Sequence, residues 1–134
     1  MVIGHALVRR LVLPTSSYIL DTKGLEMLEK RADMKKVLAV LIENNFIPKN
    51  STWNTIKFYR SSDDSSIESF DGYVGLHEVL KMTQGVKDLV REGASPTNIY
   101  EHARKAGMVT LFEDGIIACV RGLTTLDEVM RTIL

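Results

Sequence analysis

The sequence has a single cysteine, Cys119, and no long run of apolar residues. One cysteine can form neither an internal disulfide nor a cysteine-based zinc site, so we expect a small buried apolar side chain. No stretch approaches the roughly 20 apolar residues that a membrane span needs. Arg9-Arg10 follows the first apolar run, whereas a secretory signal places its positive charges before that run. We therefore predict a cytoplasmic chain with no membrane span.

The motifs that carry nucleotide or acyl chemistry are also absent. None of the nine glycines begins the Gly-x-x-x-x-Gly-Lys-Ser/Thr pattern of a phosphate-binding loop. There is no Gly-x-Gly-x-x-Gly and no Gly-x-Ser-x-Gly. His5, His77 and His102 lie far apart, with no second ligand at helical spacing. We assign no catalytic residue, no cofactor-binding residue and no metal ligand.

Net charge is zero, because seventeen basic residues balance seventeen acidic ones. A non-specific nucleic-acid binder would carry a net basic surface, so this class is not expected. A chain of 134 residues is long enough for one domain, or for one small domain with an adjoining piece.

The first half of the chain predicts one short helix and one long one. Ile3, Leu7 and Leu11 are spaced one helical turn apart, which predicts a helix that Pro14 ends. Apolar residues at helical period then predict a long helix over residues 25–43.

A small β-hairpin is expected next. Residues 56–60 alternate and are rich in β-formers, which predicts a strand, and a second strand is expected over residues 67–74. The very polar run at 61–66 would be a mobile loop between them.

Capping residues divide the last part of the chain into short helices. Thr83 and Ser95-Pro96 each predict a helix start, and Gly93 and Gly107 predict helix ends. Two capping boxes, in residues 110–113 and 125–128, predict two further helices. Such short helices need tertiary packing. The predicted fold class is mainly α, a compact bundle of short helices with a small β-hairpin.

Gly75 and the pair His77-Glu78 stand before the apolar residues 79–80, and a helix is expected to open here. A glutamate near a helix start is favoured by the helix dipole. The alternative is a small enzyme built on His77 and Glu78, for which Glu78→Gln would abolish activity without loss of stability.

Several collinear segments resemble one family, the type II secretion and type IV pilus assembly ATPases (secretion system protein E-like). Residues 72–80 (GYVGLHEVL) resemble the Gly-Arg-x-Gly-Ile-x-Glu segment late in these proteins. Residues 101–111, 113–116 and 120–129 resemble the segments that follow it: an alanine-rich helix with a Gly-Met pair, Glu-Asp-Gly, and the Gly-hydrophobic-Thr ending. Residues 6–11 (ALVRRL) resemble the Gln-Arg-Leu-Val-Arg-Lys-Leu helix just after the catalytic core.

The sequence departs from this family in three ways. Many members carry two cysteine pairs that together bind zinc, and this chain has neither pair. Tyr73 stands where the family usually has arginine, so that arginine's role is not carried over. The family's phosphate-binding loop, Walker B acid and histidine and aspartate boxes are absent. Met1 is expected to be an internal start in a longer protein; a natural stand-alone fragment or a truncated paralogue is the alternative.

The resemblance implies three regions. Residues 1–14 would continue from an absent ATPase core, residues 15–75 would be a variable insert in place of the zinc-binding region, and residues 76–134 would be the C-terminal helical bundle. The implied function is that of a structural and intersubunit module of a hexameric ATPase that drives pilin or pseudopilin assembly and protein secretion.

The resemblance also implies partners and site residues. The expected partners are the ATPase core of the same protein, neighbouring subunits and the inner-membrane platform protein, with the parent bound peripherally to the inner membrane. ATP and magnesium would belong to the parent, and none to this chain. Arg9 and Arg10 are expected at the interface with the core, and Gly75 and Glu78 as structural anchors. The alternative is a stand-alone helical adaptor that binds the motor or the platform protein.

Overall fold

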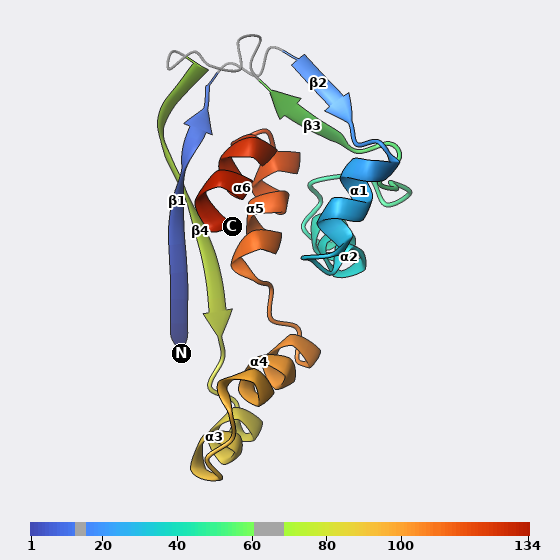
Figure 1. The fold of residues 1–134 in the computed structure, drawn as a ribbon. Helices are drawn as coiled ribbons and strands as arrows, with labels where there is room; N and C mark the ends of the chain where they lie inside the picture. The colour runs from blue at the N-terminus through green and yellow to red at the C-terminus, as the bar shows by residue number, and fades with distance from the viewer. Residues whose placement is uncertain (13–15, 61–68) are drawn as a thin grey trace.

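The computed structural model describes residues 1–12, 16–60 and 69–134, and it shows a mixed α/β fold. The prediction of a mainly α bundle is wrong, because long strands stand where two helices were expected. Figure 1 shows three parts side by side: the long strand pair, the helices at the centre of the molecule, and a further group of helices with the shorter strand pair. The remaining helices extend from one end.

The long strand pair joins the beginning and the middle of the chain. β1 (Val2–Leu11) pairs antiparallel with β4 (Phe70–Leu80), from Val2 opposite Leu80 to Leu11 opposite Phe70. The predicted helix at residues 1–14 and the helix start near Gly75 are therefore both wrong. Leu7 and Leu11 are spaced as in a helix, but the β-branched residues of β1 and its pairing with β4, far away in the sequence, favour a strand. Pro14 lies outside the described residues.

A buried helix lies at the centre of the molecule. In α5 (Leu111–Val120) nearly every residue is buried, and all residues of the helix except Glu113 and Asp114 are apolar or glycine, which is typical of a core helix. It packs against α6 (Leu126–Ile133), β4, β1, α2 (Met34–Glu43) and β3 (Lys57–Arg60). A Cβ on Gly115 would lie 2.4 Å from Cγ1 of Val129, so glycine permits the close approach of α5 and α6. Both helix starts predicted from capping residues are confirmed.

The part between β1 and β4 has its own helices and strands. α1 (Thr22–Glu29) and α2 (Met34–Glu43) replace the single long helix that was predicted, because Asp33 caps a new helix. The strand predicted at 56–60 is confirmed as β3 (Lys57–Arg60), but it pairs with β2 (Ser16–Ile19). The second predicted strand begins only at Phe70 and belongs to β4. The predicted loop at 61–66 lies outside the described residues.

The projecting pair consists of α3 (Gln84–Arg91) and α4 (Pro96–Lys105). Thr83 and Ser95 cap them as predicted, each accepting a hydrogen bond from a backbone N–H of the first turn. Gly93 and Gly107 follow the helix ends with positive φ angles of 72° and 103°, a conformation that glycine adopts without the penalty of a Cβ.

One hydrophobic core connects these parts. It includes Val8 and Leu76 of the long strand pair, Leu41 and Phe58 of the middle segment, and Ile116 of α5. Cys119 is also fully buried there, and this burial, with a smaller contribution from Asp127, raises the pKa of its thiol. No helix among the described residues is long and apolar enough to cross a membrane.

Candidate functional site

The outer edge of β1 is paired over only part of its length. The N–H of Arg9 donates to the carboxylate of Glu128, and its carbonyl accepts from the hydroxyl of Thr124 at 2.8 Å. Backbone groups of alternate residues point to the same edge of a strand, so those of Ile3, His5 and Leu7 point the same way as those of Arg9. Among the described residues, none pairs with these three along that edge.

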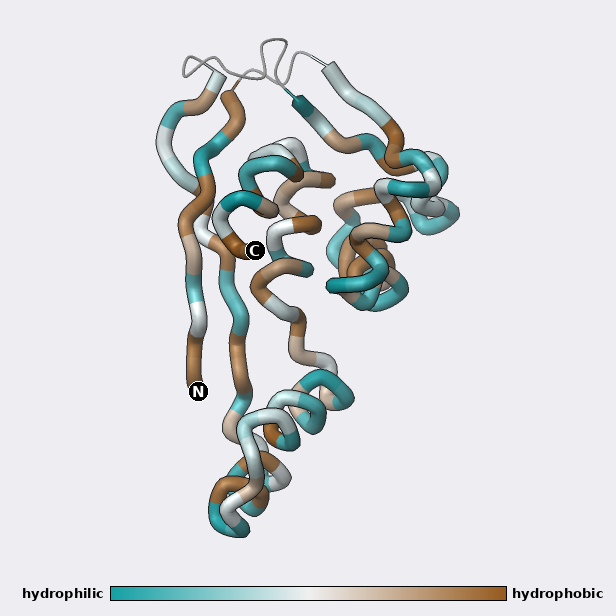
Figure 2. The backbone as a smooth tube through the Cα atoms, viewed as in Figure 1, coloured by the Kyte–Doolittle hydropathy of each residue, from teal (hydrophilic) through white to brown (hydrophobic). Residues whose placement is uncertain are grey.

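The same stretch of β1 is apolar and exposed. Ile3 is 53% exposed and Leu7 56%, which is unusual for two large apolar side chains on one strand. Figure 2 shows the strong hydrophobic colour at the end of β1 beside the N-terminus. An open strand edge with apolar side chains is a surface that commonly adds a further strand or packs on another domain.

Arg9 is held by the C-terminal helix. Its guanidinium donates through Nε at 3.0 Å and through Nη2 to Glu128, and it stacks on the ring of Phe70. Arg131 donates to the same carboxylate at 2.9 Å. Burial opposes ionisation of Glu128, but the hydrogen bonds from Arg9 and Arg131 outweigh it and hold the pKa of Glu128 below its usual value.

This cluster predicts a pH-dependent stability. Because the folded-state pKa of Glu128 is lowered, its contribution is present above the unfolded pKa and is lost as pH falls through the folded value. Glu128→Gln should cost about 2 kcal/mol at pH 7. Urea unfolding of both proteins from pH 7 to pH 3 should show this difference shrinking below about pH 4.5. Asp127→Asn, on the same turn but exposed, is the control and should change little; a pH-independent loss in Glu128→Gln would contradict the prediction.

Arg10, the other expected interface residue, is exposed and makes a local contact. Its Nε donates to the carbonyl of Asp71 at 3.1 Å, across the strand pair. Gly72, at a φ of 72°, lies beneath this guanidinium. The interface role of Arg9 and Arg10 stays a prediction, and the structure shows one of them bound within the chain and the other at its surface.

His77 and Glu78 point to opposite faces of β4, because successive side chains alternate along a strand. The carboxylate of Glu78 accepts from the N–H of Leu111 at 2.8 Å, at the start of α5. The backbone N–H of His77 donates to Asp114 at 2.8 Å. A shared reaction centre for the two side chains therefore has no support in this geometry. The anchoring role expected for Gly75 and Glu78 stays a prediction.

Glu113 joins three segments, and sequence reasoning gave it only a capping role. Its fully buried carboxylate accepts from the N–H of Thr110 at 3.1 Å and from the N–H of Asp33 at 3.0 Å. Both oxygens also accept from the guanidinium of Arg104, at the end of α4. The capping box was visible in the sequence, whereas nothing in the local pattern pointed to Arg104 or Asp33.

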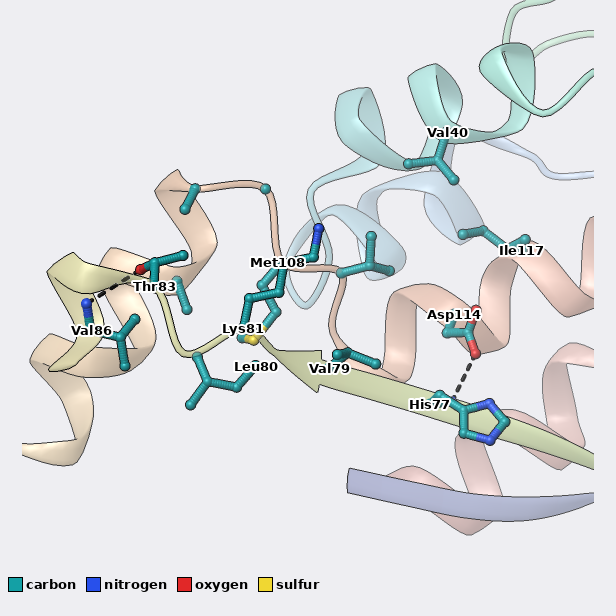
Figure 3. Close-up of a pocket in the computed structure, with 14 residues that line it drawn as sticks. Val40, His77, Val79, Leu80, Lys81, Thr83, Val86, Met108, Asp114 and Ile117 are labelled. Carbon is teal, nitrogen blue, oxygen red and sulfur yellow. Dashed lines mark hydrogen bonds between the residues drawn. The ribbon is translucent and has the colours of Figure 1, made fainter. Parts of the chain in front are cut away.

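A pocket of about 300 Å³ lies where the α3–α4 pair meets the rest of the molecule. Figure 3 shows Val86 and Thr83 on the α3 side, Val40 and Ile117 on the other, and Met108 between them. Asp114 and Thr83 each accept a hydrogen bond from a backbone N–H of the chain itself. The pocket is mostly apolar, and these two side chains serve the fold, so the arrangement fits a seam between parts better than a reaction site.

A comparison with protein-family models matches residues 1–131 to the family described as "Type II/IV secretion system protein". The match covers β1, β4, the segment between these two strands, and the helices that follow β4.

Individual relatives match about half of the chain. The protein transport protein HofB homolog of Escherichia coli is 41% identical over 64 residues, which is 48% of this chain and 14% of that protein. The type IV pilus assembly ATPase PilB of Thermus thermophilus is 42% identical over 65 residues, 48% of this chain and 7% of that protein. The type II secretion system protein E of Xanthomonas campestris is 40% identical over 63 residues, 45% of this chain and 11% of that protein. The chain thus spans a small part of the length of these relatives.

Proposed function

We propose, since this chain belongs to the type II/IV secretion system protein family, that it forms part of the C-terminal region of a secretion or pilus assembly ATPase. In this proposal it acts as a structural and intersubunit module. The nucleotide-binding core would be contributed by residues outside these 134. The parent would be a hexamer on the cytoplasmic side of the inner membrane, held there by a platform protein.

The observation that carries this proposal is the open edge of β1. The backbone groups of Ile3, His5 and Leu7 point outward, with no partner among the described residues, and the exposed side chains of Ile3 and Leu7 lie beside them. The backbone groups of an exposed strand edge are a ready template for pairing with a further strand. The core of the same protein is the partner we propose for it.

ATP and magnesium belong to the parent in this proposal. The residues of this chain do not fit them, because no glycine begins a phosphate-binding loop with its lysine and Ser/Thr. No group of three or more His, Cys, Asp or Glu side chains within residues 1–12, 16–60 and 69–134 could hold a metal ion. We therefore derive no catalytic step for this chain.

The first test is the size of the native polypeptide, by immunoblot of the source cells with an antibody raised against this chain. A band several times heavier than 15.0 kDa is expected, and it would support a part of a larger motor. A band near 15.0 kDa would overturn that proposal and would favour the adaptor that binds the motor or the platform protein.

The second test is the role of the β1 edge in assembly. Ile3→Lys and Leu7→Lys, introduced into the native polypeptide, should reduce its association with the cores of neighbouring subunits, measured as a smaller assembly by sedimentation velocity. Met27→Lys is the matched control, because Met27 is 38% exposed on α1, away from this edge. Equal assembly in all three variants would contradict the proposed use of the edge.

A further inference from the structure

His5 and His77, distant in sequence, lie directly opposite each other in the long strand pair. The N–H of His77 points away from β1, because it donates to Asp114, and the N–H of Arg9 points away from β4, because it donates to Glu128. Residues 5 and 9 share this orientation, so His5 and His77 form a pair without direct backbone hydrogen bonds between them. In such pairs the side chains lie on one face with Cβ atoms roughly 5 Å apart.

Both imidazoles are exposed, and neither makes a side-chain hydrogen bond or ion pair with another described residue. Gly75, two residues before His77 on the same face, leaves room for its ring: a Cβ there would lie 3.1 Å from Cε1 of His77. The next positions on this face are Leu7 opposite Gly75, and Ile3 opposite Val79.

We propose that His5 and His77 together bind a divalent transition metal ion of the borderline class, such as Ni²⁺, Zn²⁺ or Cu²⁺. Imidazole nitrogen suits these ions, whereas Mg²⁺ and Ca²⁺ prefer oxygen ligands. Two ligands from opposite strands would link β1 to β4, and water would complete the coordination. No third His, Cys, Asp or Glu in the described part of the chain joins them, so affinity depends on both imidazoles together.

The test is isothermal titration of the tag-free 134-residue chain with NiCl2 at pH 7.5, with MgCl2 as the ion that should not bind. The wild-type chain should bind one Ni²⁺. His5→Gln and His77→Gln should each weaken binding about tenfold or more, because even the loss of a residue that only orients a ligand costs about 10–100-fold in metal affinity. His102→Gln, which removes the remaining histidine, on α4, is the matched control and should bind as the wild type does. Retained affinity in either variant of the pair, or an equal loss in His102→Gln, would overturn the proposal.

A second readout needs no variant. In proton NMR spectra of the wild-type chain, substoichiometric Cu²⁺ should broaden the ring signals of two histidines together and leave the third sharp. Broadening of all three rings to the same extent, or of one alone, would also overturn the proposal.

Discussion

Glu113→Gln is expected to lower the free energy of unfolding by about 3–5 kcal/mol, the range for breaking a buried charge pair by removing one partner. The carboxylate is fully buried and accepts hydrogen bonds from Arg104, Asp33 and Thr110. The amide of Gln has an NH2 donor in place of one acceptor oxygen, and this group would lie against the N–H donors that now bind the carboxylate. It also leaves the guanidinium of Arg104, only 19% exposed, without its counter-charge.

The measurement is urea unfolding at pH 7 followed by circular dichroism. Glu101→Gln, an exposed glutamate on α4, is the control and should change stability by about 0.5 kcal/mol or less. Arg104→Gln should also destabilise, and the double variant should lose less than the sum of the two, because both single changes break the same contact. A loss below about 1 kcal/mol in Glu113→Gln would show that the cluster does not hold these segments together.

This cluster shows why sequence reasoning reached part of the site and missed the rest. The capping box of Thr110 and Glu113 is a local pattern, because the two residues must lie one turn apart for their bonds to form. Arg104 and Asp33 reach the same carboxylate only because α4, α2 and α5 meet in the folded chain. A local pattern predicts the cap; only tertiary structure brings in the other donors.

The same distinction explains the largest error in the predicted fold. The helices from α3 to α6 were found because each has a capping residue directly before its first turn, and α3 and α4 also have a glycine just after the helix end. The paired residues of β1 and β4 lie 59 to 78 positions apart in the sequence, so no local signal links them. The spacing of Ile3, Leu7 and Leu11 fits a helix, and the pairing with β4 overrides that preference. The opposed histidines were missed for the same reason.

The family resemblance reached further than the local patterns did. It rested on the order of several short segments, and the family match over residues 1–131 supports it. It did not correct the secondary structure of residues 2–11, because a motif such as ALVRRL states which residues follow one another and not which backbone they adopt.

Phe58→Ala should reveal whether the segment between β1 and β4 is part of the main core, with an expected loss of about 3–5 kcal/mol. Phe58 on β3 is fully buried in the core that also contains Ile116 and Val8. The rings of Tyr18 and Trp53 lie 6.1 and 6.3 Å from its own, centroid to centroid. Removing the ring leaves a cavity between this segment and α5, and partial collapse recovers only some of the lost contacts.

Trp53 makes the measurement specific, because it is the sole tryptophan and its indole N–H donates to the carbonyl of Met34 at 3.2 Å. Urea unfolding should be followed by Trp53 fluorescence and by circular dichroism, and in the wild type the two transitions should coincide if the segment and the helices unfold together. Phe46→Ala is the control: Phe46 is 42% exposed and stacks under Arg121, so about 0.5–1 kcal/mol is expected. The prediction would be contradicted if Trp53 fluorescence changed at a clearly lower urea concentration than circular dichroism, and if Phe58→Ala had little effect on the circular dichroism transition. The segment would then be a separate unit attached to the α5–α6 core.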